Sequence, residues 1–232
     1  MAYLIYLGYN IRRKPRFVHK YSVSCYAQLS NGGMRMTRIK KLNCLAVFTI
    51  LVALVAAPAI QAQTIADAKT KVDAMPDDPP RHYNLGIAYF KAGQFTNAIG
   101  AFQKAVELKA DYKEAHYNLG LSQQKAGQTS NAIKSFQKAT EIDAKYADAH
   151  GALGSAYQKL KNSSRAIRSY RAAIGINGKK ANWHYNLGIL YQTREDYPNA
   201  IRSYENYLRL APRARNAASL RNIVAQMKDA IR

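Results

Sequence analysis

The chain has 232 residues, of which 48% are hydrophobic and 21% are charged, and its net charge is +21. This length allows one or two domains, and the hydrophobic content excludes a chain that is disordered as a whole. The charge is uneven, because residues 1–62 carry 9 basic and no acidic side chains, whereas residues 63–232 carry 26 basic and 14 acidic ones.

The segment 34–62 has the three parts of a secretory signal peptide. Basic residues open it, an uncharged run from Cys44 to Ala57 follows, and small residues close it around Ala59 and Ala62. The apolar run is shorter than the roughly 20 residues that span a bilayer comfortably. We therefore expect either a cleaved leader or an uncleaved single-pass anchor. Both predict that the residues after 62 lie outside the cytoplasm, in the periplasm of a bacterium.

Residues 1–33 precede this leader and show no clear periodicity. We interpret them as an over-extended start upstream of Met34 or Met36, or alternatively as a short disordered tail. Both cysteines, Cys25 and Cys44, also lie before residue 63. The exported part is therefore expected to have no disulfide, no thiolate nucleophile and no cysteine metal ligand.

The rest of the chain is organised by a pattern that returns every 34 residues. His-Tyr-Asn-Leu-Gly begins at His82, His116 and His184, and an altered copy, His-Gly-Ala-Leu-Gly, begins at His150. A fixed period of this size indicates stacked repeats. It divides the chain into four units, at 79–112, 113–146, 147–180 and 181–214.

Each unit has the spacing of two amphipathic helices joined by a short turn. In the first unit, Leu85 and Tyr89 share one helical face, Gly93 ends that helix, and a second helix turns Ala98 and Phe102 inward. Residues 63–78 carry the second-helix pattern alone and predict an N-terminal capping half-repeat. Residues 215–232 predict a C-terminal capping helix, which covers the apolar face of the last unit.

These columns resemble those of the tetratricopeptide repeat family. The resemblance covers about 79–214 and rests on Leu85, Gly86, Tyr89, Ala98, Phe102 and Ala105 with their equivalents in the other units. The chain departs from the family pattern at Gln123, at Tyr207, and in a histidine column where the family has Trp. The resemblance implies an all-α fold, an α-solenoid of stacked helix-turn-helix tetratricopeptide repeats with capping helices. It also implies that the first helix of each unit lines a concave groove.

That implied groove is a candidate peptide-binding site. An Asn amide can donate to and accept from a peptide backbone, and Tyr supplies rigid contact area. Gly151-Ala152 replaces Tyr-Asn in the third unit, which predicts a gap for a bulky partner side chain. The alternative is that these residues are only the family's structural consensus. The predicted groove residues are Tyr83, Asn84, Ile87, Lys91, Tyr117, Asn118, Leu121, Lys125, Ser155, Lys159, Tyr185, Asn186 and Ile189.

The sequence shows no phosphate-binding loop, nucleophile elbow or zinc-protease motif, so we expect no catalytic residues and no cofactor. The repeated histidines do not predict a metal site. Neighbouring repeats are separated by roughly 8–10 Å, whereas zinc ligands must each lie about 2 Å from one ion. We interpret the histidines as packing residues and the protein as not an enzyme.

Positive charge accumulates toward the C-terminus, where residues 161–232 hold 14 basic and 4 acidic side chains. The main hypothesis is a protein–protein interaction scaffold that binds a protein or extended peptide in the groove during envelope assembly or secretion. The alternative is a structural envelope protein that contacts anionic lipid or cell-wall polymer through a basic convex face. Nucleic acid is disfavoured by the export signal. The arginines expected away from the groove are Arg165, Arg168, Arg171, Arg202, Arg209, Arg213 and Arg215.

Overall fold

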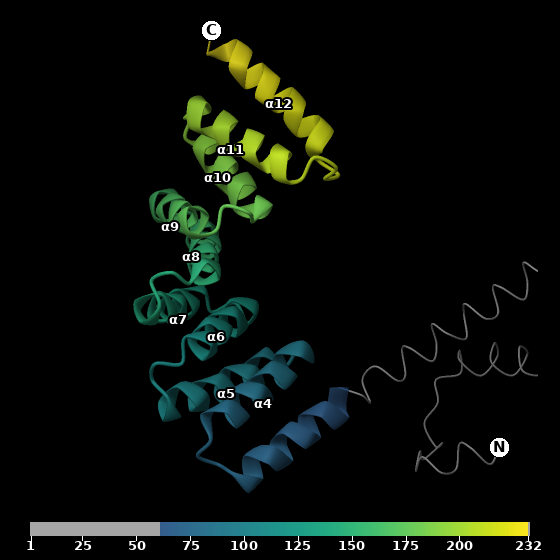
Figure 1. Cartoon of the computed structure of the whole chain (residues 1–232), viewed down its shortest axis with the longest axis vertical. Helices are drawn as coiled ribbons and strands as arrows, with labels where there is room; N and C mark the ends of the chain where they lie inside the picture. Colours follow the sequence, from purple (N-terminus) through teal and green to yellow (C-terminus); the bar gives the residue numbers. More distant parts are fainter. Residues whose placement is uncertain (1–60, 232) are drawn as a thin grey trace, which may run out of the picture. The chain divides into compact units, whose positions relative to one another are not determined.

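A computed structural model describes residues 61–231, and these residues form helices joined by short turns, without a strand. The segment 1–33 and the predicted leader up to residue 60 lie outside the described residues. A helix over 61–74 precedes four helix pairs and a final helix (Figure 1). They are α4 (Pro79–Lys91) and α5 (Phe95–Leu108), α6 (Lys113–Lys125) and α7 (Thr129–Ile142), α8 (Ala147–Lys159) and α9 (Ser163–Ile176), α10 (Ala181–Thr193) and α11 (Tyr197–Leu210), and α12 (Ala217–Ala230). The predicted all-α solenoid is confirmed.

Local sequence signals explain where the helices begin. Proline occupies the first turn of α4 and of α11, where a missing N–H has no intrahelical partner to lose. The side chains of Asn162 and Asp196 cap α9 and α11 by accepting from the backbone N–H groups of Arg165 and Asn199. Within residues 61–231, no helix is long and apolar enough to cross a membrane.

The turn inside each pair needs one residue with a left-handed backbone. Gly93 and Gly127 have φ of 73° and 83°, values that cost glycine little. The equivalent residues of the third and fourth pairs are Lys161 and Glu195, with φ of 58° and 60°. These two side chains therefore sit in a strained backbone conformation.

The predicted Leu-Gly element packs the two helices of a pair together. A Cβ atom built on Gly86 would lie 2.6 Å from the Phe102 ring, and one on Gly188 would lie 2.5 Å from the Tyr204 ring. Phe102 and Ala98 are fully buried beside this contact. Glycine is therefore required on the first helix because an aromatic ring of the second helix lies against its backbone.

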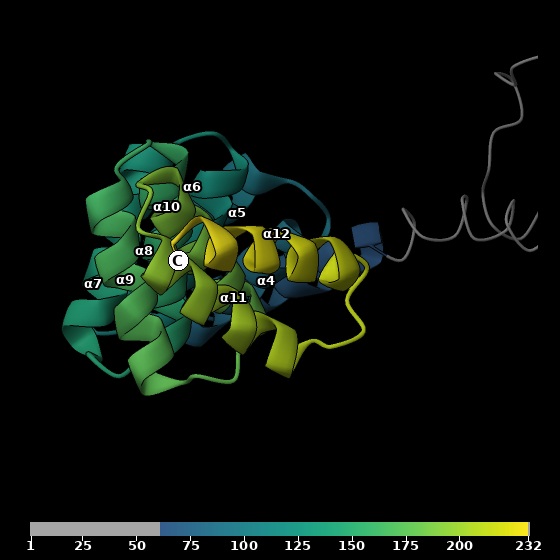
Figure 2. The same cartoon turned by 90° about the horizontal axis from the view of Figure 1, so that it is seen from above.

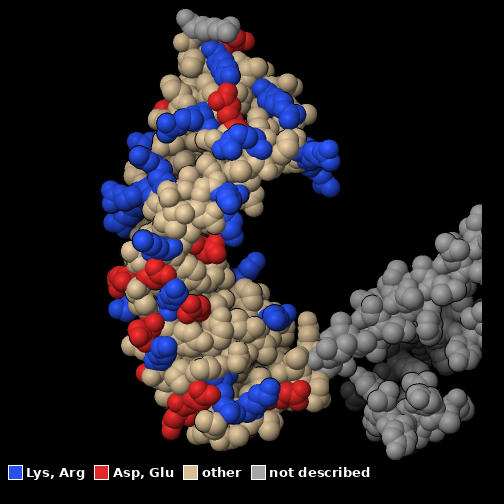
Figure 3. All heavy atoms as spheres, in the orientation of Figure 1, with Lys and Arg blue, Asp and Glu red and all other residues tan. Residues whose placement is uncertain are grey.

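Successive pairs stack because each second helix packs on the next first helix, from α5 on α6 to α11 on α12. The first helices also meet one another, α4 with α6 and α6 with α8, while no equally extensive contact joins second helices of neighbouring pairs. The first helices therefore lie on the inner side of the curve, and the array is hollowed on one side (Figure 3). Seen from above, successive pairs point in different directions, as in a superhelix (Figure 2).

Candidate functional site

We define the first-helix face as the inner surface formed by α4, α6, α8 and α10. All thirteen predicted groove residues belong to these four helices. Five of them are exposed, namely Asn84, Lys91, Lys125, Ser155 and Lys159. The other eight are half-buried, namely Tyr83, Ile87, Tyr117, Asn118, Leu121, Tyr185, Asn186 and Ile189. The face is thus a mixture of exposed polar groups and partly covered apolar ones.

The tyrosines of this face pack as much as they present surface. The Tyr83 ring lies 5.1 Å from the Tyr112 ring and 5.7 Å from the Phe102 ring, measured between centroids. Tyr117 and Tyr185 make the same kind of paired contacts in their own repeats. Burial raises the pKa of the Tyr83 and Tyr117 phenols, so both stay neutral and keep an O–H donor.

The three predicted asparagines have different surroundings. Asn118 donates to the Tyr83 hydroxyl of the preceding repeat at 3.1 Å and to the Glu114 carbonyl at 2.9 Å. Asn186 donates to the Tyr170 hydroxyl of its preceding repeat at 3.1 Å. These two amides therefore tie neighbouring repeats together. Asn84 is exposed, and its side chain forms no hydrogen bond to another described residue, so the side-chain amide is available to a ligand.

The gap predicted at Gly151-Ala152 is wrong, because Trp183 fills it. A Cβ atom on Gly151 would lie 2.4 Å from the Trp183 indole nitrogen, and Gly151 itself is buried. Trp183 stands where the second repeat, the third repeat and α12 have the buried alanines Ala115, Ala149 and Ala217. At the junction between the third and fourth repeats, Gly151 and Trp183 therefore replace the tyrosine and alanine that the second junction has at Tyr117 and Ala149. One aromatic ring fills the space at each of these junctions. The two departures, Gly151 and Trp183, are visible in the sequence and lie 32 residues apart, the same separation as between Tyr117 and Ala149 at the second junction.

A row of lysines ends the first three first helices. Lys91, Lys125 and Lys159 are the last residues of α4, α6 and α8, and all three are exposed. Within residues 61–231 none of them forms an ion pair. Two of the three lysines on α5 and α7 differ, since Lys104 and Lys138 pair with glutamates three residues on, at 3.8 and 3.4 Å.

The four repeat histidines fasten the loops between repeats. Each directs its Nε2 at the backbone carbonyl six residues earlier, at distances from 2.6 Å for His82 to 3.1 Å for His150. A carbonyl oxygen only accepts, so Nε2 carries the proton and donates. Residues 61–231 contain no group of three His, Cys, Asp or Glu side chains arranged to hold a metal ion. The histidine column is therefore accounted for by loop anchoring.

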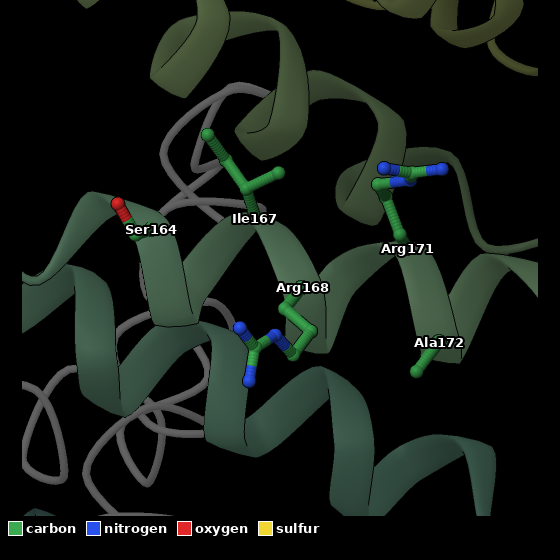
Figure 4. A pocket seen from close by; sticks show the side chains of 5 residues that line it. All are labelled: Ser164, Ile167, Arg168, Arg171 and Ala172. Atoms are coloured by element: carbon green, nitrogen blue, oxygen red, sulfur yellow. The ribbon is translucent and has the colours of Figure 1, made fainter.

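The outer surface, formed by the second helices α5, α7, α9 and α11, carries two shallow depressions, both beside α9. One, of about 470 Å³, is lined by Ser164, Ile167, Arg168, Arg171 and Ala172 (Figure 4). The other, of about 440 Å³, lies between α7 and α9, and its lining includes Leu153, Tyr157, Arg165 and Arg168. All seven arginines predicted away from the groove lie on α9, on α11 or in the loop after α11, and all seven are exposed. Arg165 also lies over the Tyr157 ring, at 5.7 Å from its centroid.

Three family models match the repeats of this chain. A family model described as "TPR repeat" matches residues 88–127 and 125–161, and two described as "Tetratricopeptide repeat" match residues 147–180 and 184–218. No curated protein matches the sequence.

Among solved structures, the chain is similar to a crystal structure of MamA, with 26% identity and a TM-score of 0.62 over 64% of this chain and 86% of that one. It is also similar to MamA from Desulfovibrio magneticus RS-1, with 19% identity and a TM-score of 0.62 over 73% of this chain and 96% of that one. A third structure is YrrB, described as "a TPR protein with an unusual peptide-binding site". It has 18% identity and a TM-score of 0.61 over 74% of this chain and 88% of that one.

Proposed function

This chain belongs to the tetratricopeptide repeat family, and from that membership we propose that it is a non-enzymatic scaffold that binds a protein or extended peptide along its first-helix face. The observation that carries the proposal is the set of polar side chains on this face that form no hydrogen bond or ion pair within the described residues. Asn84, Lys91, Lys125 and Lys159 are exposed and have no hydrogen-bond or ion-pair partner among the described residues. Two of the three lysines on α5 and α7, Lys104 and Lys138, instead pair with glutamates three residues on.

The chemistry of these groups suits a peptide chain. The Asn84 amide can pair with both a backbone N–H and a backbone carbonyl, which fixes an extended segment without reading its side chains. The lysines at the ends of α4, α6 and α8 add positive charge at one point in each of the first three repeats. Half-buried rings, such as Tyr83 and Tyr185, offer apolar edges between them. YrrB, which shares the fold, is described as having a peptide-binding site, and this supports the proposal by analogy only.

The proposal extends to where the scaffold works. The leader pattern at 34–62 suggests that the repeats act outside the cytoplasm, in envelope assembly or secretion. N-terminal sequencing of the mature protein, recovered from fractionated cells, tests this part. A mature chain that starts near residue 60 or 63 in the periplasmic fraction supports export. A chain that keeps residues 1–33 and stays in the cytoplasmic fraction refutes it.

The groove itself is tested with two lysine variants of equal charge. Peptides are first selected from a displayed library on the full chain. Binding is then measured by calorimetry for Lys91→Ala/Lys125→Ala/Lys159→Ala and for the control Lys104→Ala/Lys134→Ala/Lys138→Ala, which lies on second helices. The proposal predicts that the first variant loses affinity by about tenfold or more and that the control changes it by less than about twofold. Equal losses in the two variants would remove the first-helix face from the account.

A further inference from the structure

The outer surface changes character between the second and third repeats. In α5 and α7 the positions three residues apart hold the ion pairs Lys104–Glu107 and Lys138–Glu141. One repeat further on, the same two columns hold Ala172 and Gly175, and in the fourth repeat the acidic column holds Arg209. The acids that neutralise the surface of the first two repeats are therefore missing from the third and fourth.

The cations change at the same boundary. Every basic residue of α5 and α7 is lysine, and every basic residue of α9 and α11 is arginine. Helix α9 contains no acidic residue, and the one acid of α11, Glu205, is already paired with Lys228 of α12 at 2.8 Å. Arg168, Arg171 and Arg202 are exposed and form no ion pair within the described residues. Blue side chains gather accordingly along the outer edge in Figure 3.

These arginines stand beside small apolar surfaces. Figure 4 shows Arg168 and Arg171 leaving α9 in different directions, with Ile167 next to Arg168 along the helix and pointing away from it. Ile167 and Ala172 supply the apolar part of one depression, and Leu153 and Tyr157 supply that of the other. Arg168 lines both depressions. A ligand for this surface needs anionic groups for the guanidinium forks and an apolar group for the depressions.

We propose that the outer surface of α9 and α11 docks an acidic protein segment in which carboxylates alternate with apolar side chains. Carboxylates can bind the guanidinium groups of Arg168 and Arg171 in a two-pronged fashion, and the apolar side chains between them fill the depressions. A lipid surface matches less well, since its headgroups bring charge to the arginines but no apolar side chain to the depressions that the same arginines line. This site is separate from the first-helix face.

The test uses the full chain and a labelled peptide that alternates glutamate with leucine, with a glutamine-for-glutamate peptide as its uncharged counterpart. Fluorescence anisotropy compares wild type, Arg168→Ala/Arg171→Ala and the control Lys104→Ala/Lys134→Ala, which removes the same charge from the first two repeats and leaves Glu141, which lines the second depression, paired with Lys138. We expect the arginine variant to weaken binding by about tenfold or more and the control by less than about twofold. Arg168→Lys/Arg171→Lys, which keeps the charge, should fall between them because it loses the paired donors.

Three outcomes overturn the proposal. Equal weakening by the arginine and lysine variants means that only net charge matters. Equal binding of the glutamine peptide means that carboxylates are not recognised. Vesicles that contain phosphatidylglycerol and bind in an Arg168- and Arg171-dependent way, while the peptide does not bind, assign the surface to a membrane instead. Thermal unfolding verifies that each variant folds, and Lys91→Ala/Lys125→Ala/Lys159→Ala should bind this peptide normally, which separates this result from that for the groove.

Discussion

Exchanging the aromatic residue at the third repeat junction provides a quantitative test of how the repeats fit together. Gly151→Tyr alone builds a side chain where the Trp183 ring already lies, because even a Cβ atom would approach the indole nitrogen to 2.4 Å. Overpacking of this kind costs about 1–3 kcal/mol, reduced by roughly 0.5 kcal/mol because Tyr is a better helix former than Gly. Trp183→Ala removes a half-buried ring and should cost about 2 kcal/mol, less than the removal of a fully buried one.

The double variant Gly151→Tyr/Trp183→Ala recreates the tyrosine and alanine of the other junctions, such as Tyr117 with Ala149. We expect its free energy of unfolding to lie within about 1 kcal/mol of wild type, which gives a coupling energy of at least about 1.5 kcal/mol between the two sites. Urea unfolding followed by circular dichroism measures all four proteins. If the two single losses simply add, the ring exchange is not what stabilises this junction.

Three further predictions concern single residues. Gly86→Ala should lower the free energy of unfolding by about 1–3 kcal/mol because its Cβ meets the Phe102 ring, whereas Gly100→Ala, with open space around it, should raise that free energy by about 0.5–1 kcal/mol. Urea midpoints measure both, and a shift in the same direction for the two variants would contradict the packing role of Gly86. Lys161→Gly and Glu195→Gly should each stabilise by up to about 1 kcal/mol, since both residues have positive φ. Thermal unfolding tests this, and two destabilised variants would rule it out. Burial and the neighbouring Tyr185 raise the pKa of Tyr204 to about 12. An unfolded phenol ionises near pH 10, so this contribution to stability is complete below about pH 10 and is lost as the pH rises through 12. Tyr204→Phe should flatten that alkaline decline, and unchanged slopes would speak against it.

The fold was predictable because its main determinants are local and repeat along the chain. Leu85-Gly86 and Phe102 recur at a fixed period, and each of their contacts is made within one repeat or between neighbours. Because the pattern recurs in four units, a single departure such as Gln123 does not change the assignment of the helices. In the structure, buried Gln123 accepts a hydrogen bond from Ser135 at 2.7 Å, which explains how the core tolerates it.

The details of the first-helix face were less predictable, because they depend on which neighbour a side chain reaches. The sequence places Asn84, Asn118 and Asn186 in one column, but only the structure shows that Asn118 and Asn186 donate to tyrosines of the preceding repeat. The same limit explains the error at Gly151. A glycine looks like an empty place until the residue that packs on it, Trp183, is located in the next repeat.

The charge of the outer surface was predictable only as a total. The excess of basic residues over 161–232 is clear from the sequence. The ion pairs that form depend on the fold, because Glu205 pairs with Lys228 of α12 and not with Arg202 or Arg209. Ion pairing therefore separates a balanced surface on α5 and α7 from an unbalanced one on α9 and α11.

Hydrogen–deuterium exchange of the full chain, with and without a peptide selected from the library, tests whether the first-helix face binds a protein chain. We expect slower exchange in α4, α6, α8 and α10 when the peptide is bound, with the surface amides of α5 and α7 unchanged. Slower exchange confined to the second helices, with the first helices unaffected, would contradict it.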